Sequence, residues 1–544
     1  MLPKLHSARP TVRRRAVVVA AGLALLGTAL PVTAVEGAGS AEPDLTRFYR
    51  QKVTWGGCAG EGIPKDLQCG KVTVPLDYAK PRSGTLDLAV ARFRATGERR
   101  GSVVLNFGGP GGAGVTELAY GGEDFMGLSD GYDVVSFDPR GVGRSSPVSC
   151  GDASYESGTE DSGGSADPLK DPDALMRQLR AVAAECAKHS GPVLEHIGTV
   201  NASRDLDVIR QSLGDEKLNY LGFSYGTRLG AVYAEQFPGK VGRVTLDGVD
   251  TLTEPLTEQG IAGAKGQQTA LEDFLNWCVE DIACPFGTDP RRARQEIVKL
   301  VRSMDEDPVP TTFSGGFSGQ DLVSAISQAL YSEELWPLLE RALASLVEDG
   351  DTRGVESFAT GGMTTPGVGV SRTAGGAARP KPGGRGAGLT DPEAVPPDNL
   401  PAALVAVNCA DDPDRPGSRQ LSQELTRLRA AYQQASPVFG SYRLTQLLLC
   451  FGRPKGTDFI RERVKDVDTA KMLLVGTRGD PATPYRWTVQ TAKRLGPSAV
   501  VLDNKGDGHT GYASSKCVRG KVDAFLLYGS LPPSGSSCPD EEDG

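Results

Sequence analysis

Short apolar runs bounded by turn residues recur along two stretches of the chain, and helical patterns lie between several of them. We interpret eight of these runs as strands, at residues 72–76, 86–93, 103–107, 132–137, 218–221, 241–246, 471–475 and 499–502. Segments 173–188 and 202–213 have the closely spaced apolar positions of helices. Strands that alternate with helices are typical of a mainly parallel sheet covered on both faces. The pattern therefore predicts an α/β fold.

The alternation stops between residues 251 and 465, where helical patterns recur without strands. They occupy segments 266–279, 290–304, 320–330, 336–348 and 420–434. A block of this size between two sheet strands predicts a large inserted helical cap. Within it, segment 361–397 is rich in Gly, Pro, Ala and Thr and has few large apolar residues. Because it cannot bury enough surface to offset the entropy of ordering, we expect a mobile loop there.

The N-terminus has the layout of a secretory signal peptide. Five basic residues lie among the first 15, and an apolar stretch at 16–30 is followed by Pro31 and small residues. The stretch is shorter than the ~20 residues of a spanning helix, so we expect no stable membrane insertion after cleavage. We therefore divide the chain into a signal peptide at 1–41 with cleavage near 34–41, a first core segment at 42–250, the cap at 251–465, a second core segment at 466–530 and a tail at 531–544.

Composition and charge narrow the function. Hydrophobic residues make up 39% and charged residues 23% of the 544 residues, which is typical of a soluble globular protein. The net charge is −9 and basic residues are scattered, so we expect no nucleic-acid partner. No cofactor motif is recognised, and we favour a monomer although no sequence signal addresses the oligomeric state. The predicted location is secreted or at the cell surface.

Ten cysteines agree with export. An even number in an exported chain predicts disulfide bonds. Their connectivity cannot be deduced from sequence, but they fall into neighbouring couples, and short loops suit pairs such as Cys58–Cys69 and Cys278–Cys284. None has Cys-x-x-Cys spacing and only four histidines are present. A structural zinc site is therefore a poor alternative, and we expect no metal.

The strongest chemical signal is Gly222-Phe223-Ser224-Tyr225-Gly226, which stands between a predicted strand and a helical segment. Gly-x-Ser-x-Gly in this context predicts a nucleophile elbow, a tight turn that exposes a serine hydroxyl above the sheet. The flanking glycines avoid collisions with the neighbouring backbone. A chance match in a chain with 69 glycines is the alternative. The strand before and the helix after favour the catalytic interpretation.

A nucleophilic serine needs a base, and the few histidines limit the choice. His6 lies in the predicted signal peptide, whereas His189 and His196 precede the elbow in a polar stretch. His509 follows the last predicted strand in a Gly-rich loop. Such a loop allows an imidazole to reach across the end of the sheet, so we predict His509 as the base for Ser224. A solvated loop histidine is the alternative.

The base in turn needs a carboxylate that orients it. Asp480 comes just after the predicted strand 471–475, at the same edge of the sheet. Asp247 follows the strand before it and is the rival. Asp503 and Asp507 share the strand or loop of the histidine and are poorly placed to orient it. We therefore predict the order Ser, Asp480, His, which is that of an α/β-hydrolase.

The oxyanion of a tetrahedral intermediate needs two backbone donors. The residue after the nucleophile supplies one, the N–H of Tyr225. We assign the other to Gly109, in the glycine-rich loop 108–112 after the third strand. A phosphate-binding loop is the alternative, but this loop lacks both the Gly-Lys-Ser/Thr ending and the Gly-x-Gly-x-x-Gly spacing.

Four motifs together resemble a known group of enzymes. They are 106–112 (NFGGPGG), 138–145 (DPRGVGRS), 222–227 (GFSYGT) and 479–484 (GDPATP). In this order they resemble the prolyl-iminopeptidase-like serine peptidases, with the exported tripeptidyl aminopeptidases as the most similar branch, over about residues 49–527. The resemblance implies an α/β-hydrolase fold with an eight-stranded sheet. It also implies a secreted exopeptidase that releases short peptides, of the tripeptidyl type, or a residue from the free N-terminus of a peptide.

Two other functions remain open. A triad of this kind also serves esterases and lipases, and a hydrolase fold without catalysis can serve as a binding protein. An aminopeptidase requires a carboxylate for the substrate ammonium, and the cap has six acidic candidates, none of which we assign. They are Glu254, Glu258, Glu272, Asp273, Asp411 and Asp412.

Overall fold

The computed structural model describes residues 43–60, 62–151, 172–311, 316–359, 388–415 and 418–540. The predicted signal peptide lies outside these residues, as does most of the predicted loop 361–397.

One mixed sheet carries the fold, with the strand order β1-β2-β3-β5-β4-β6-β7-β10-β11-β12. Its strands are β1 (Gly56–Gly57), β2 (Gln68–Pro75), β3 (Thr85–Phe93), β4 (Ser102–Asn106), β5 (Asp133–Phe137), β6 (Leu218–Phe223), β7 (Val241–Asp247), β10 (Met472–Gly479), β11 (Ala499–Asp507) and β12 (Ser537–Cys538). From β5 to β12 the strands run parallel, whereas β1, β2 and β3 pair antiparallel. All eight predicted strands are present. The two-residue strands β1 and β12 extend the edges, so the sheet has ten strands rather than eight.

Helices cover both faces of this sheet, as the α/β prediction requires. The helices of the two core segments are α1 (Thr46–Tyr49), α2 (Gly114–Gly121), α4 (Pro172–Ser190), α5 (Thr199–Leu213), α6 (Tyr225–Gln236), α16 (Tyr485–Leu495) and α17 (Lys516–Tyr528). Alternate residues of β4 point to opposite faces: Val104 packs with α5, α6 and α16, whereas Val103 and Leu105 pack with α2 and α17. Because strand side chains alternate with a period of two, one apolar strand supplies both cores.

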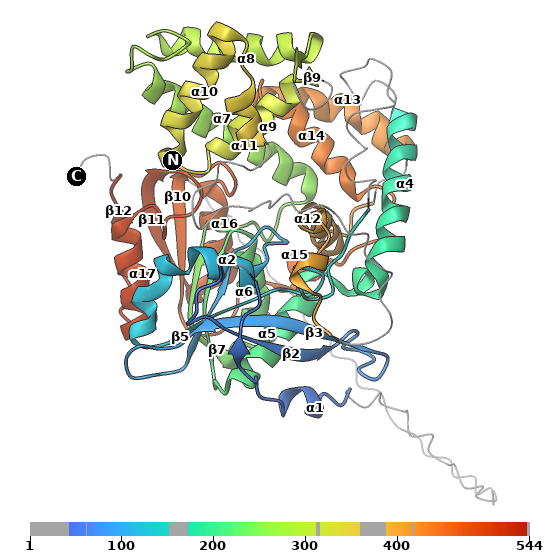
Figure 1. Cartoon of the computed structure of the whole chain (residues 1–544), viewed down its shortest axis with the longest axis vertical. Coiled ribbons are helices and arrows are strands. Elements are labelled where there is room, and N and C mark those ends of the chain that lie inside the picture. The colour runs from blue at the N-terminus through green and yellow to red at the C-terminus, as the bar shows by residue number, and fades with distance from the viewer. Residues whose placement is uncertain are drawn as a thin grey trace, which may run out of the picture. The chain divides into compact units, whose positions relative to one another are not determined.

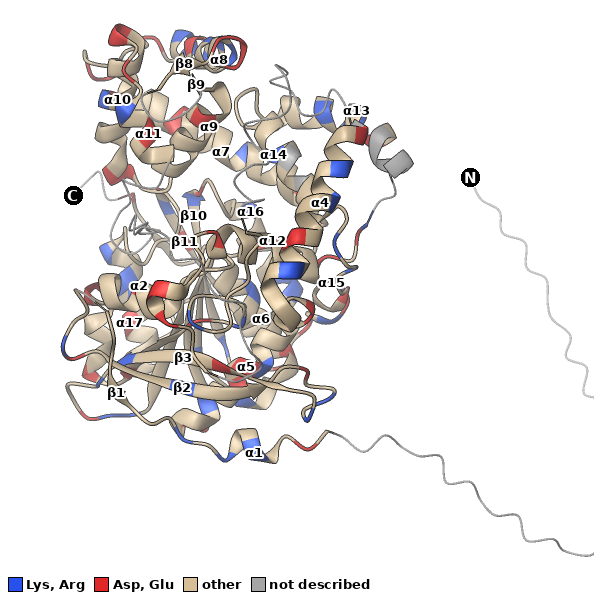
Figure 2. Cartoon of the chain, turned by 45° about the vertical axis from the view of Figure 1, so that its right-hand side comes forward, with Lys and Arg blue, Asp and Glu red and all other residues tan. Residues whose placement is uncertain are grey.

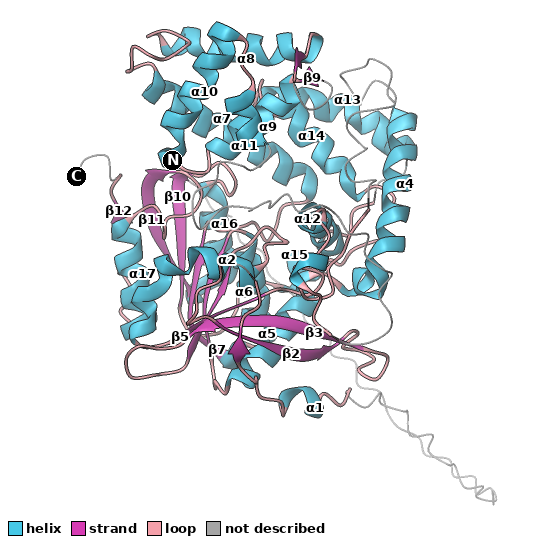
Figure 3. Ribbon diagram, viewed as in Figure 1, coloured by secondary structure: helices cyan, strands magenta, loops and turns pink. Residues whose placement is uncertain are grey.

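The described residues between 251 and 465 are mainly helical, and those from 270 to 358 form a hydrophobic core of their own with Val438 and Phe439. Their helices are α7 (Leu256–Cys278), α8 (Pro290–Glu306), α9 (Gly319–Ala329), α10 (Trp336–Asp349), α11 (Arg353–Ala359), α12 (Asn399–Asp411), α13 (Ser418–Ala435), α14 (Gly440–Leu447) and α15 (Phe459–Arg463). Phe274, Ile326 and Leu339 are fully buried in this second core. Figures 1 and 3 show α7 to α11 gathered beyond the ends of β10 and β11. A two-stranded sheet, β8 (Val309–Pro310) and β9 (Gly316–Phe317), adds to the helices.

Five disulfides join each cysteine to its neighbour in sequence, which confirms the expected pairing of couples. The bonds are Cys58–Cys69, Cys150–Cys186, Cys278–Cys284, Cys409–Cys450 and Cys517–Cys538. The last bond fastens β12 to α17, so the described part of the predicted tail belongs to the edge of the sheet.

Charge and hydropathy agree with the composition. Figure 2 shows acidic and basic residues interspersed over helices and loops rather than separated into one basic stripe. Within the described ranges, no helix combines the length and apolar character needed to cross a bilayer.

Candidate active site

Ser224 occupies a strained turn between β6 and α6. Its φ of 54° and ψ of −122° lie in a region that residues with side chains rarely adopt. A Cβ at Gly222 would lie 2.6 Å from the Gly226 carbonyl oxygen, and one at Gly226 would lie 2.7 Å from the Asn106 oxygen. Both flanking positions therefore require glycine. The predicted strand, turn and helix around the serine are present, and the serine itself is only half-buried.

The loop predicted to supply an oxyanion donor lies against this turn. Gly108 has a φ of 86°, and a Cβ there would lie 3.0 Å from Ser224 Cβ and 3.3 Å from the Tyr225 nitrogen. Tyr225 is the first residue of α6, so its N–H has no acceptor within the helix. Gly109 follows in the left-handed region, before a cis bond to Pro110. The structure thus brings the backbone of loop 108–112 to the turn that carries Ser224.

The imidazole of His509 and the carboxylate of Asp480 form a direct pair. Nδ1 of His509 lies 2.9 Å from each carboxylate oxygen of Asp480. Both side chains are buried, with 6% and 0% exposure. Burial of the imidazole opposes its positive charge, but the Asp480 carboxylate outweighs this effect and raises the pKa of His509. The pair has the base and acid geometry of a serine hydrolase.

Asp247, the alternative candidate for the acid that orients the histidine, makes different contacts. Its carboxylate accepts hydrogen bonds from the N–H groups of Gly511 at 3.0 Å and Tyr512 at 2.8 Å, and burial raises its pKa to about 6. Its main-chain oxygen accepts the N–H of Ser224 at 2.9 Å. Asp247 therefore ties the histidine loop to the nucleophile turn through the backbone, and the geometry favours Asp480 as the orienting acid.

Gly248, the residue after Asp247, lies against the loop that carries His509. A Cβ at Gly248 would lie 3.3 Å from Cε1 of His509, so only a glycine lets the ring approach this strand end.

Asp503 and Asp507 are the carboxylates closest to His509 in sequence. Asp503 forms an ion pair with Arg478 at 2.7 Å. Neither carboxylate near the histidine in sequence contacts its ring among the described interactions.

Sequence reasoning missed three residues that support the pair. Thr483 Oγ1 donates to Asp480 at 2.8 Å and lies 3.4 Å from His509 Nδ1. Tyr331, between α9 and α10, accepts the N–H of His509 on its main-chain oxygen at 2.9 Å, and its ring meets the imidazole edge to face. Glu333 accepts the N–H of Asp507 at 3.0 Å. Thr483 stands in the quoted GDPATP motif, but no signal marked the other two.

Most acidic candidates for the substrate ammonium already have partners. Glu254 pairs with Arg486 at 2.9 Å, and Glu272 lies 3.7 Å from Arg294. Glu258 is exposed, and burial raises the pKa of the half-buried Asp273.

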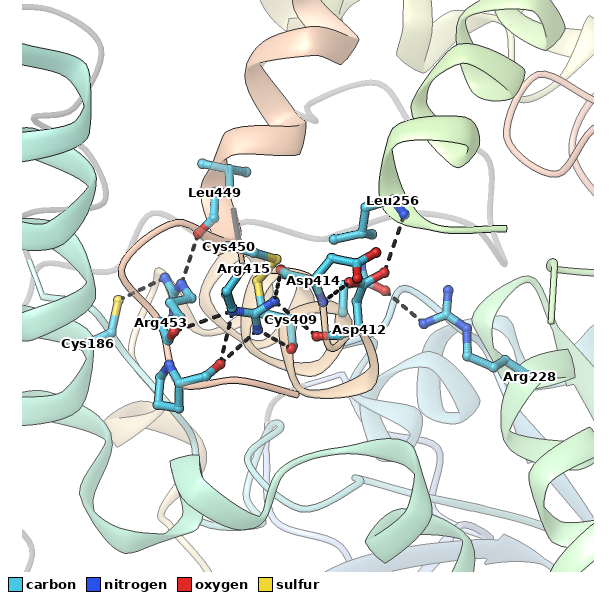
Figure 4. The surroundings of a disulfide bond; sticks show 12 residues. Cys186, Arg228, Leu256, Cys409, Asp412, Asp414, Arg415, Leu449, Cys450 and Arg453 are labelled. Atoms are coloured by element: carbon cyan, nitrogen blue, oxygen red, sulfur yellow. Dashed lines mark hydrogen bonds between the residues drawn. A yellow bond between two sulfur atoms is a disulfide. The ribbon is translucent and has the colours of Figure 1, made fainter. Parts of the chain in front are cut away.

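Asp411 and Asp412 lie at the end of α12. Asp411 accepts from the Thr199 N–H at 2.8 Å and lies 3.4 Å from Arg228, whereas Asp412 accepts from the N–H groups of Asp414 and Leu256. Figure 4 shows Asp412 beside the Cys409–Cys450 disulfide, which lies near the end of α12. The two carboxylates also line a small pocket, together with Glu254, Asn408 and Arg461 among others.

One group of metal-ligand residue types occurs within the described part of the chain. It consists of Cys278, Cys284 and Glu340, and its two cysteines are joined in a disulfide. A disulfide sulfur is not a thiolate and does not serve as a zinc ligand.

Two family models match the chain, one described as alpha/beta hydrolase fold over residues 102–340 and one as TAP-like protein over residues 436–538. The Serine protease Hip1 of Mycobacterium tuberculosis is 33% identical over 518 residues, which are 92% of this chain and 92% of that protein. The chain belongs to the α/β-hydrolase family. It is a serine hydrolase of the peptidase type.

Two further relatives have names that refer to different substrates, peptides in one case and esters in the other. The Tripeptidyl aminopeptidase of Streptomyces coelicolor is 32% identical over 517 residues, covering 90% of this chain and 87% of that protein. The Carboxylesterase B of Mycobacterium tuberculosis is 30% identical over 500 residues, covering 89% of each chain.

Proposed function

We propose that this protein is a secreted exopeptidase that releases tripeptides from the free N-terminus of peptides through an acyl-enzyme. The observation that carries the proposal is the 2.9 Å pair of His509 and Asp480, at the same end of the sheet as the strained Ser224 turn. The relative named Tripeptidyl aminopeptidase supports the substrate class. Five disulfides support export, because disulfides form and persist in oxidising compartments outside the cytosol.

Each residue has a role in this proposal. Ser224 Oγ attacks the scissile carbonyl carbon while Nε2 of His509 takes its proton. The negative oxygen of the tetrahedral intermediate receives the N–H groups of Tyr225 and Gly109. The histidine then gives the proton to the leaving amine, and water hydrolyses the acyl-enzyme by the same steps in reverse. Asp480 holds Nδ1–H and stabilises the imidazolium.

The test compares a chromogenic tripeptide substrate with its N-acetyl form. A free N-terminus carries an ammonium whose pKa is ~7.7–8.0, and burying it without a carboxylate is unfavourable. Acetylation removes both the charge and the fit, so we expect kcat/KM to fall at least tenfold, or ~1.4 kcal/mol. An equal or better rate with the acetylated peptide refutes the exopeptidase assignment.

An esterase is the second candidate. The relative named Carboxylesterase B and the engaged state of most cap carboxylates favour it. A short-chain ester of the same chromophore, assayed beside the tripeptide, separates the two functions. Higher kcat/KM on the ester, with no preference for a free amine, would replace the peptidase proposal.

A further inference from the structure

Arg443 is a half-buried cation in α14, and it forms no ion pair with the described residues. Its Nε donates to Gln267 at 2.8 Å and its NH1 to Gln446 at 3.3 Å, and both acceptors are neutral amides. In the part of the chain that the structure describes, no carboxylate lies within 4.0 Å of the guanidinium. Its remaining terminal N–H donors have no acceptor among the described residues.

Other buried arginines of this protein are held differently. Arg140 pairs with Asp205 at 2.6 Å and Arg228 with Asp250 at 2.7 Å. Arg415 lacks a close carboxylate, but all three of its nitrogens donate to main-chain oxygens next to the Cys409–Cys450 disulfide (Figure 4). Arg443 has neither arrangement. The unpaired donors of a half-buried guanidinium gain most from a carboxylate, whose two oxygens match a pair of N–H groups.

The guanidinium lies close to the catalytic pair. A Cβ at Gly263 of α7 would lie 3.3 Å from Cζ of Arg443, and a Cβ at Gly266, one turn further, would lie 3.2 Å from the main-chain oxygen of Asp480. Because residues three apart on a helix are ~5–6 Å apart, Cζ lies within about 12 Å of that oxygen.

Tyr331 connects the two positions. Its ring meets the imidazole of His509 at 5.1 Å between centroids. Burial raises the pKa of Tyr331, the Arg443 charge lowers it and the Asp480 charge raises it, so both charges act on this one side chain.

We propose that Arg443 binds a carboxylate of the peptide substrate. The inference rests on the proposed peptidase function and adds a preference for anionic peptides. The carboxylate can be the C-terminus of a short peptide or the side chain of Asp or Glu, because both present the same pair of oxygens.

The experiment uses peptide pairs with identical free N-termini. One pair compares a C-terminal acid with its amide, and the other compares Glu with Gln at successive positions in amidated peptides. Wild type is expected to favour the carboxylate form in at least one pair, and R443Q to reduce kcat/KM for that form at least tenfold while changing the neutral form less than twofold. R443K should retain part of the preference. R294Q, in which a cap arginine with an acidic neighbour is changed, should behave as wild type.

Three results overturn the inference: no preference in wild type, an unchanged preference in R443Q, or an equal loss on charged and neutral peptides. Thermal unfolding of R443Q and its fluorophosphonate labelling rate report on folding and on the catalytic centre. A failure of the peptidase proposal gives a different result. In that case neither peptide of either pair is cleaved, whereas an ester substrate is.

Discussion

The assignment of Asp480 over Asp247 predicts that two similar substitutions have very different effects. Asp480 Oδ1 accepts the N–H groups of Ala482 at 2.8 Å and Thr483 at 2.7 Å. In D480N the amide oxygen must keep that position, so the NH2 group takes the place of Oδ2, 2.9 Å from Nδ1 of His509. An amide donor there favours the neutral imidazole with its proton on Nε2, the nitrogen that must accept the serine proton, and leaves Oδ1, also 2.9 Å from Nδ1, as the one acceptor for the productive tautomer.

The shift to this unproductive tautomer determines how far kcat should fall in D480N. In serine hydrolases it lowers kcat by ~10⁴, or ~5.5 kcal/mol in transition-state stabilisation. In D247N an amide oxygen at the Oδ2 position can still accept the N–H groups of Tyr512 at 2.8 Å and Gly511 at 3.1 Å, and the bond from Gly511 to Oδ1 is lost. Loss of a bond to a charged acceptor is worth ~1.5–3 kcal/mol, mainly in stability of the histidine loop, so kcat should fall less than ~100-fold.

The assay measures kcat and KM for both variants on the same chromogenic tripeptide, with thermal unfolding as the control for folding. D480N should keep a KM near that of wild type, since the substituted atom does not contact substrate in this mechanism. Two results would refute the reasoning: a loss in folded D247N as large as in D480N, or more than ~1% of wild-type kcat remaining in D480N.

Three further predictions follow from particular contacts. Because the pKa of His509 is raised and the base must be neutral, kcat/KM should fall on the acid side with a midpoint above 6.5, and a pH–rate profile with a lower midpoint contradicts this. E333A should lower kcat/KM about three- to tenfold by freeing the N–H of Asp507, and E333Q, whose amide oxygen still accepts it, should restore activity; equal losses exclude this role. Burial and the Asp138 charge raise the pKa of Glu117 to about 7 in the folded protein, whereas the ordinary value is 4.5. The folded state therefore keeps a proton that the unfolded state releases above pH ~4.5. The stability that the protonated carboxyl contributes is lost as pH rises through 7. Melting temperatures from pH 5 to 8 should therefore fall more in wild type than in E117Q, and parallel curves would count against it.

The sheet and the nucleophile turn were predictable because their signals are local. An apolar strand, two glycines around a serine and a following helix occupy adjacent residues, and steric exclusion at Gly222 and Gly226 makes that pattern specific. The scarcity of histidine made elimination effective, because His189 lies on the surface beside Glu185 and not at the sheet end. The catalytic roles of these residues remain predictions until they are tested.

The contacts that sequence reasoning missed are between residues distant in the chain. Glu333 and Asp507 are 174 positions apart, and no local pattern marks a pair of this kind. Helix α12 escaped prediction because its sequence is apolar on nearly all sides and lacks the period of an amphipathic helix. Strand β12 has two residues, too few for any alternation, and a disulfide keeps it at the sheet edge.

The central claim is that Ser224 is the nucleophile of a serine hydrolase. The most direct measurement is labelling of the purified protein with a fluorophosphonate, followed by peptide mapping, in wild type and in Ser224→Ala. We predict one modified peptide, which contains Ser224, with stoichiometric loss of activity, and neither labelling nor turnover in the folded variant. Stoichiometric labelling at another serine, or turnover by the variant within tenfold of wild type, would contradict the account.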